Sequence, residues 1–334
     1  MLVLLAVMPI LVRFDSVIAP SPLYRRPELC YSFIMNTFDL QIQSSASDGK
    51  HAPKDIITMA KERDVATIAL TDHDTVGGVE EAVEAGSKVG VRVIPGVEIS
   101  VEEHGLHILG FGIDEKHESL LTAFQEAHKG RIEGAKKMVE NLRQAGFVVE
   151  WSDVEKEATG GVVARPHIAR AILGRPENKE KLGAISNVHE FIQAHLTDEN
   201  PNYVKRSHMS AHDAIALIHG AGGVAVWSHP AIHFQEDPDG VEKCLRGLID
   251  GGLDGIEVFN PSHREDDAEY LEGLASRYAL LRTGGSDFHE AGDHAYDPKT
   301  GLHAARFIGD FETYGFLTQD ILPRLEEAIR KLKI

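Results

Sequence analysis

Seven carboxylate and imidazole side chains follow, or lie close to, short apolar runs of this chain, and their types suit metal binding. Carboxylate oxygen and neutral imidazole nitrogen are ligands that manganese, zinc and iron all accept. Such ligands could hold two or three adjacent divalent cations, and cations about 3.5–4 Å apart can clamp a phosphoryl group and activate a water for in-line attack. The pattern therefore predicts a multinuclear hydrolase. The seven residues are Asp48, His73, Glu98, His107, His229, Asp287 and His289.

Each of these residues also has an ordinary structural explanation. A single histidine after a strand is more often a hydrogen-bonded structural residue, and a single aspartate there is commonly a helix N-cap. The recurrence of such residues along the chain, rather than any one of them, favours a metal centre.

The elements that must position these residues are predicted by apolar runs that alternate with amphipathic stretches. Strands are predicted at 38–43, 66–70, 91–99, 106–112, 222–227, 255–259 and 278–285, with helices between them. This alternation indicates an α/β fold with a mostly parallel sheet, open or closed into a barrel. Most of the seven residues come at the carboxyl end of a strand, where such folds gather their functional groups. His107 is the exception, because it opens its strand.

The middle of the chain has a different pattern. Residues 117–215 are dominated by helical periodicity, which predicts a helical insertion, or cap, between two barrel segments at 36–116 and 216–334. Because function in such folds lies in the loops at strand ends, the insertion is expected to shape or cover the active site. Residues 1–35 are predicted to be an appendage of uncertain order. Its opening apolar run meets Arg13 too soon to span a bilayer, which takes about 20 apolar residues.

The composition excludes several classes of protein. The chain has 334 residues, and its 52 acidic against 34 basic side chains give a formal net charge of −18. A protein with this net negative charge would repel nucleic acid and anionic membranes. The protein is therefore not expected to coat nucleic acid or to bind a membrane. Cys30 and Cys244 are the two cysteines, which excludes a disulfide framework and a thiolate zinc site. A cytoplasmic location is expected, and nothing in the sequence indicates an oligomeric state.

The runs that carry the seven residues resemble the PHP (polymerase and histidinol phosphatase) family over residues 37–310. They are SDG (47–49), TDHD (71–74), PGVEIS (95–100), LHILGFG (106–112), ARPHIARA (164–171), GGVAVWSHP (222–230), GIEVFN (255–260) and GGSDFH (284–289). The resemblance is to stand-alone metal-dependent phosphoesterases. It implies a distorted, TIM-like (β/α)7 barrel with a helical insertion over the barrel mouth. It also implies hydrolysis of a small phosphomonoester, such as a nucleoside bisphosphate or an RNA 5′ end.

The resemblance further implies how the cations are held. The family's pattern assigns one cation to Asp48, His73 and His289, and a second to Glu98, His107 and His229. Glu98 would also bridge to a third cation, which Asp287 helps to bind. Two to three divalent cations are therefore expected, manganese first, with zinc or iron as alternatives. Water would be activated at the cations, which gives a catalytic role to Asp48, His73, Glu98 and His289.

This chain departs from the family at the third cation. The family's first motif is D-L-H-x-H-S, whereas residues 39–44 read DLQIQS, so Gln41 and Gln43 replace both imidazoles. An amide oxygen is a weak ligand for a transition metal, and an amide NH2 cannot coordinate at all. The third cation is therefore expected to be weak or absent. Two interpretations follow: a phosphoesterase with reduced or altered activity, which we favour, or a catalytically impaired relative that binds a nucleotide or a protein partner.

The resemblance also implies residues that bind the substrate. These are Arg131, Arg165, His167, Asn260 and His263. Relatives place a pair of arginines on the helix after the LHILGFG strand, and this chain keeps Arg131 but has Gly134 at the second position. Losing one of the two guanidinium groups is expected to weaken or shift phosphate binding.

Overall fold

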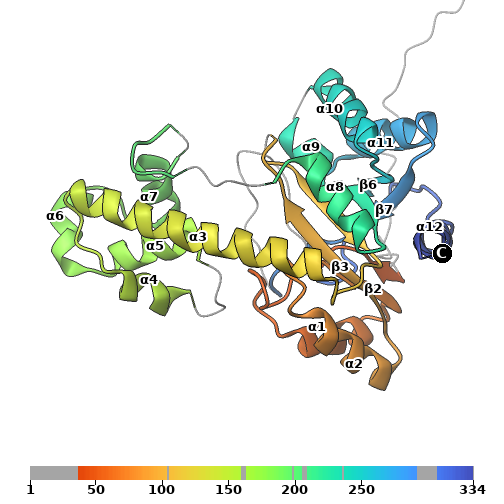
Figure 1. Ribbon diagram of the computed structural model, residues 1–334, viewed down its shortest axis with the longest axis horizontal. Coiled ribbons are helices and arrows are strands. Elements are labelled where there is room, and N and C mark those ends of the chain that lie inside the picture. Colours follow the sequence, from red (N-terminus) through yellow and green to blue (C-terminus); the bar gives the residue numbers. More distant parts are fainter. Residues whose placement is uncertain are drawn as a thin grey trace, which may run out of the picture. The chain divides into compact units, whose positions relative to one another are not determined.

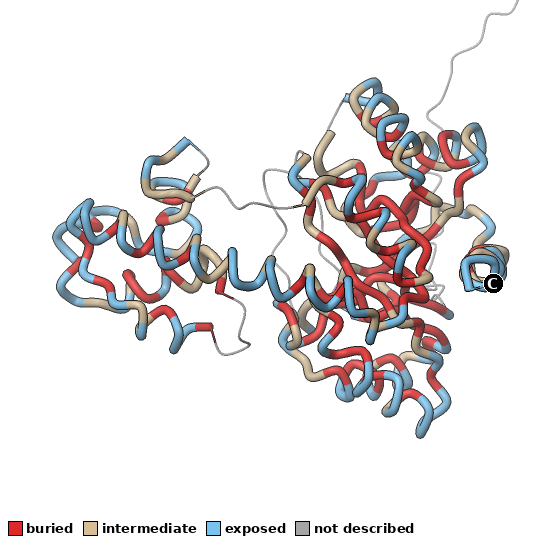
Figure 2. Tube along the Cα trace, viewed as in Figure 1, coloured by how far each residue is buried: buried red, intermediate tan, exposed pale blue. Residues whose placement is uncertain are grey.

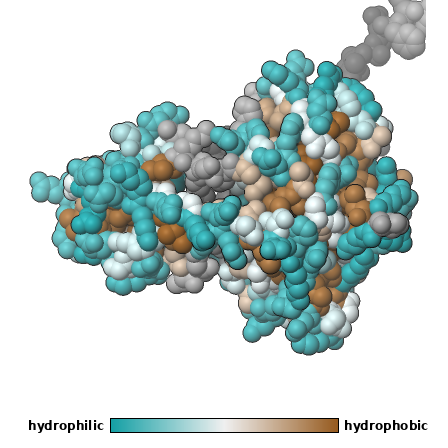
Figure 3. Space-filling model, in the orientation of Figure 1, coloured by the Kyte–Doolittle hydropathy of each residue, from teal (hydrophilic) through white to brown (hydrophobic). Residues whose placement is uncertain are grey.

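The computed structural model describes residues 37–103, 105–158, 163–197, 199–204, 209–234, 237–291 and 307–333. The predicted appendage at 1–35 lies outside these residues. Within the described ranges, no helix combines the length and the apolar character needed to cross a membrane. On the face shown in Figure 3, hydrophilic side chains predominate and hydrophobic ones appear in smaller groups between them.

Seven strands form one sheet in chain order (Figure 1). They are β1 (Phe38–Asp39), β2 (Thr67–Leu70), β3 (Arg92–Ser100), β4 (His107–Phe111), β5 (Val224–Trp227), β6 (Gly255–Phe259) and β7 (Leu281–Gly284). The backbone N–H of Leu40 donates to the carbonyl of Gly284 at 3.2 Å, and Ile42 forms a bridge with Phe288. The first strand thereby meets the last, and the sheet forms a nearly closed barrel. The predicted distorted (β/α)7 barrel is confirmed.

The sheet is mostly parallel, as expected, but β4 runs in the opposite direction. β4 is antiparallel to both β3 and β5, and Ser100 at the end of β3 pairs with His107 at the start of β4. The other neighbouring pairs are parallel. Because an antiparallel strand begins at the edge where its neighbour ends, the reversal brings His107 to the same rim as the carboxyl ends of the parallel strands.

Helices with one apolar face surround the barrel. They are α1 (Pro53–Glu62), α2 (Val79–Val89), α8 (Ala211–Gly220), α9 (Pro230–His233), α10 (Pro238–Asp250), α11 (Glu265–Arg277) and α12 (Ile321–Leu332). In α1, Pro53 supplies the backbone angle of the first turn, and Ile56 and Ala60, four residues apart, are buried. The strands are the most buried part of the barrel (Figure 2), and Trp227 on β5 is fully buried.

A second hydrophobic core forms among the helices of the insertion. These are α3 (Glu118–Gln144), α4 (Trp151–Glu157), α5 (Arg165–Leu173), the 3-10 helix η1 (Pro176–Asn178), α6 (Lys179–Leu182) and α7 (Val188–His195). Helix α3 belongs to both cores: Phe124 packs in the barrel core, whereas Leu142 packs in the second core with Phe191. Because α8 packs on β4 and β5, we propose that the insertion ends before α8, slightly earlier than the expected boundary at residue 215.

The buried side chain of Asn178 stabilises the second core through three hydrogen bonds. Its Oδ1 accepts from the N–H of Val148 at 2.7 Å, and its Nδ2 donates to the carbonyls of Val148 and Ile172, each at 2.9 Å. Asn178→Ala leaves these backbone groups without their side-chain partner, so we expect the free energy of unfolding to fall by about 2–3 kcal/mol in urea denaturation. Asn141→Ala is the control, because its Nδ2 makes longer bonds near the surface, 3.3 Å to the carbonyl of Asn202. An equal loss in both variants would contradict the prediction.

Candidate metal centre

The loop after β1 is held by a buried carboxylate and presents Asp48 at the barrel rim. Asp72 accepts from the N–H of Ser44 at 2.7 Å and from its hydroxyl at 2.8 Å. Gly49 is required in this loop, because a Cβ there would lie 2.3 Å from the carbonyl oxygen of Gln43. These contacts fix the loop, and the side chain of Asp48 stays 54% exposed.

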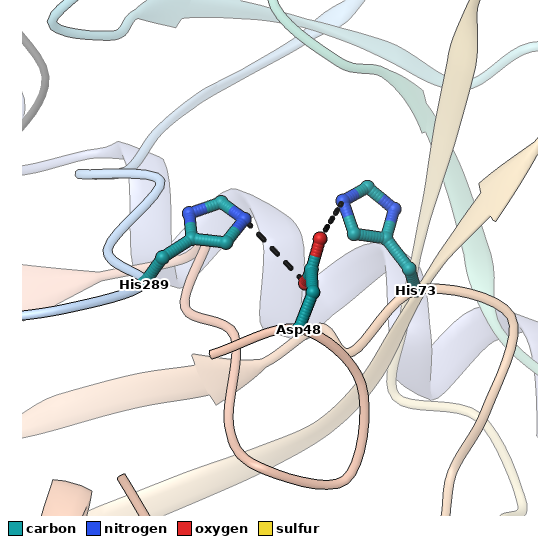
Figure 4. Close-up of side chains that lie close together, drawn as sticks. All are labelled: Asp48, His73 and His289. Atoms are coloured by element: carbon teal, nitrogen blue, oxygen red, sulfur yellow. Dashed lines mark ion pairs between the residues drawn. The ribbon is translucent and has the colours of Figure 1, made fainter. Parts of the chain in front are cut away.

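Asp48, His73 and His289 form a first ligand cluster from three separate stretches of the chain (Figure 4). Oδ2 of Asp48 lies 4.0 Å from Nε2 of His73, and Oδ1 lies 3.6 Å from Nε2 of His289. Nδ1 of His289 is 2.7 Å from the backbone carbonyl of Asp287, which can only accept. The proton of His289 therefore lies on Nδ1, and Nε2 turns its lone pair toward the cluster, as in many metal-binding histidines.

A second, more buried cluster consists of Glu98, His107 and His229. Oε1 of Glu98 lies 2.8 Å from Nδ1 of His107 and 3.2 Å from Nε2 of His229, and the two imidazole nitrogens are 3.3 Å apart. His73 joins the two clusters, because its Nε2 also lies 3.9 Å from Oε2 of Glu98. The structure thus brings together the six residues expected to hold two cations.

The charge of Glu98 is maintained by its neighbours. Burial alone would raise the pKa of Glu98, but His73 and His107 outweigh it and hold that pKa well below its ordinary value. For His107, burial favours the neutral imidazole, whereas the hydrogen bond to Glu98 prevails and raises the pKa. Glu98 is therefore a fully buried carboxylate anion, which is the form that ligates a metal.

Three residues of the rim have strained backbones. Asp74, His229 and Asp287 all have positive φ angles, of 53°, 30° and 52° respectively. Residues other than glycine rarely adopt this region, at a cost of about 1–3 kcal/mol each. All three follow the ends of parallel strands, so strained backbone occurs where the side chains converge. Such strain is typical of functional sites.

Comparison with known proteins identifies the family. The PHP domain model matches residues 39–165. The 3′,5′-nucleoside bisphosphate phosphatase of Chromobacterium violaceum is 33% identical, over 79% of this chain and 90% of that protein. The 5′-3′ exoribonuclease of Haemophilus influenzae is 32% identical, over 75% of this chain and 89% of that protein. This chain belongs to the PHP family. It is a metal-dependent phosphoesterase, and hence a hydrolase, of that family.

A solved structure has the same fold. An amidohydrolase from Chromobacterium violaceum, determined with bound sulfate and no metal, has a TM-score of 0.71 and 31% sequence identity. The match covers 87% of this chain and 96% of the other. The barrel and the insertion described above are therefore both within the range of the comparison.

At the third cation position of the PHP family, this chain directs amide N–H groups toward Glu98. Nε2 of Gln41 and Nε2 of Gln43 both donate to Oε2 of Glu98, at 3.0 and 2.7 Å. Nε2 of Gln41 also donates to Oγ of Ser228 at 2.9 Å, and Oε1 of Gln41 accepts from Asn260 at 3.0 Å. Both glutamines are completely buried. Amide N–H groups thus face Glu98 where a ligand would need a lone pair.

A cavity of about 750 Å³ lies beside the two clusters of the PHP site. Asp48, His73 and His107 line it from the barrel, and the lining from the insertion includes Arg131, His167 and Arg170. Arg131 and His167 are expected at the site from the sequence, whereas Arg170 is not among the expected residues. The sequence feature that could have identified Arg170 is its position in α5, three residues after His167 and therefore on the same helix face.

The other expected substrate residues are not among those that line this cavity. The guanidinium of Arg165 donates to the carbonyl of Leu196 at 3.2 Å, and Arg165 is not among the residues that line the cavity. Asn260 and His263 are buried, and Nδ1 of His263 lies 2.9 Å from the carbonyl of Val258. Burial lowers the pKa of His263 to about 4, so this imidazole is neutral at pH 7. A substrate contact for these three residues stays a prediction.

Proposed function

We propose that this PHP protein hydrolyses the phosphomonoester of a small nucleotide, such as a nucleoside 3′,5′-bisphosphate, with two bound divalent cations. An RNA 5′ end is the second substrate class. One observation carries the proposal: two carboxylate–imidazole clusters, joined through His73, share a cavity with cationic side chains of the insertion. The Chromobacterium relative, a 3′,5′-nucleoside bisphosphate phosphatase, supports a phosphomonoester substrate, and the Haemophilus relative, a 5′-3′ exoribonuclease, supports an RNA 5′ end as the second substrate class.

The two clusters are the proposed ligands of the two cations. Asp48, His73 and His289 hold one cation, and Glu98, His107 and His229 hold the other. Divalent cations bound there lower the pKa of a bound water and neutralise charge on the phosphoryl oxygens. Manganese is the proposed occupant, with zinc or iron as alternatives, because all three accept nitrogen and carboxylate ligands and this donor set contains no sulfur.

The insertion supplies the proposed phosphate contacts. Arg131 is held by Asp74, with 2.5 Å between NH2 and Oδ2, and Nε of Arg170 donates to Glu157 at 3.1 Å. These carboxylates orient the guanidinium groups, which can then bind phosphate oxygens in a forked geometry.

His167 is the proposed neutral donor to the phosphate. Its Nδ1 accepts from the N–H of Ala164 at 2.9 Å, so the ring proton lies on Nε2 and is available to a phosphate oxygen. Burial and the nearby Arg170 lower the pKa of His167, which keeps the ring neutral at pH 7.

Removal and return of metal tests the proposal. After chelation and dialysis, we expect phosphate release from adenosine 3′,5′-bisphosphate to fall to background, and Mn²⁺ to restore it more than Zn²⁺ or Fe²⁺. A 5′-phosphorylated RNA oligonucleotide and a phosphodiester are assayed in parallel, and both should react more slowly. If the reloaded protein binds adenosine 3′,5′-bisphosphate but releases no phosphate, the impaired-relative interpretation replaces this one.

A further inference from the structure

A second cavity, of about 640 Å³, adjoins the cavity of about 750 Å³ at the metal centre. It is lined by the loop between β2 and α2 and by the first half of α3, and we call it the α3 pocket. It shares His73 and Arg131 with the cavity at the metal centre. Residues that line the α3 pocket include Thr75, Val76, Leu121, Phe124, Gln125 and His128. A group bound here would therefore lie next to a phosphate at the metal centre.

One face of α3 forms an apolar wall of this pocket. Leu121, Phe124, His128 and Arg131 are spaced by three or four residues, which places them in a row along the helix. Phe124 is buried, whereas Leu121 is 36% exposed although it is a large apolar side chain. Val76, from the loop between β2 and α2, adds a buried apolar group. Apolar walls with a few polar groups are typical of small-molecule sites.

The charges around the α3 pocket indicate a neutral ligand. Glu80 and Glu115 line it together with Lys116 and Lys129. Nζ of Lys116 lies 3.1 Å from Oε1 of Glu80, so these two charges already compensate each other. A second phosphate would meet carboxylates here as well as ammonium groups, and a neutral group avoids that repulsion.

We propose that the α3 pocket binds the base of the nucleotide substrate and so determines specificity. This inference rests on the proposed function. A base has apolar faces, which fit Leu121, Phe124 and Val76, and a polar edge, which fits the amide of Gln125 and the hydroxyl of Thr75. Arg131 lines both cavities, so a phosphate bound by it and the cations leaves the base to extend along α3.

The test compares adenosine 3′,5′-bisphosphate with its abasic analogue, in which hydrogen replaces the base. Leu121→Asp puts a charge on the apolar wall at an exposed position, and Gly77→Phe fills the pocket, where a Cβ would meet only Oγ1 of Thr75 at 3.4 Å. The measured quantity is kcat/KM for the adenosine compound divided by kcat/KM for the abasic analogue. For each variant we expect this ratio to fall about tenfold, mainly through a higher KM for the adenosine compound.

The control is Val83→Asp, a comparable exposed apolar position on α2 (39% exposed) that is not among the residues lining the pocket. It should leave the ratio unchanged. Equal effects on both compounds, or no effect, in Leu121→Asp and Gly77→Phe would overturn the inference. If the wild-type protein releases phosphate from neither compound, the proposed function fails. The pocket is then judged by the equilibrium dissociation constants of the same two compounds. The constant for the adenosine compound divided by that for the abasic analogue should rise about tenfold in Leu121→Asp and Gly77→Phe and stay unchanged in Val83→Asp, and an unchanged ratio in the first two variants would overturn the inference.

Discussion

His73→Ala is expected to remove nearly all phosphoesterase activity and to weaken both cations at once. Nε2 of His73 lies 4.0 Å from Asp48 and 3.9 Å from Glu98, so this one imidazole serves both ligand clusters. Losing it leaves the first cluster with two of its three ligands and removes the imidazole that links this cluster to Glu98 of the second, so the reactive water loses the cations that activate it. We expect kcat to fall about a thousandfold or more at saturating Mn²⁺, which corresponds to about 4 kcal/mol of transition-state stabilisation.

Elemental analysis of the same variant separates loss of metal from misfolding. His73→Ala should bind fewer than two cations per chain, while its unfolding transition in the presence of a chelator stays close to that of the wild type. His212→Ala is the matched control, because His212 lies on α8, where its Nε2 is 2.9 Å from the carbonyl of Gly247. This control should keep full activity and both cations. If His73→Ala retains both cations and more than about a tenth of the wild-type rate, the shared role of His73 is wrong.

Gln41→His combined with Gln43→His is expected to create a third cation site. In the wild type, the two amide NH2 groups donate to Oε2 of Glu98 at 3.0 and 2.7 Å and occupy the side of that carboxylate where the family has two imidazoles. Imidazole offers a lone pair in place of an N–H donor, and Glu98 can then bridge two cations. Bound manganese should rise from two to three per chain, and kcat should rise about tenfold if the third cation limits the rate.

The control for this double variant adds two imidazoles elsewhere. Gln144→His with Gln193→His changes two positions at the ends of α3 and α7, away from the clusters, and Gln144 bonds only to Glu140 among the hydrogen bonds described. Its metal content should stay at two. A wild-type chain that already holds three cations would contradict the prediction, and so would a Gln41→His, Gln43→His variant that holds two.

Much of the fold could be predicted from local pattern. The strand at Gly255–Phe259 has the bounds expected from its apolar run, and the helix at Ala211–Gly220 is one of the helices expected between the strands. Burial on both faces gives barrel strands a continuous apolar character, and the helices show one apolar face, so both are readable without coordinates. The candidate ligands Asp48, His73 and Glu98 were likewise recognisable, because they occur in family motifs next to predicted strands.

Strand direction and side-chain partners were decided only by the tertiary structure. Apolar periodicity is the same for a parallel and an antiparallel strand, so the sequence left His107 as an exception until the reversal of β4 brought it to Glu98. The motif showed that Gln41 and Gln43 differ from the family, but their hydrogen bonds to Glu98 depend on rotamers within a closed barrel. Contacts between residues far apart in the chain follow from packing, which no local pattern encodes.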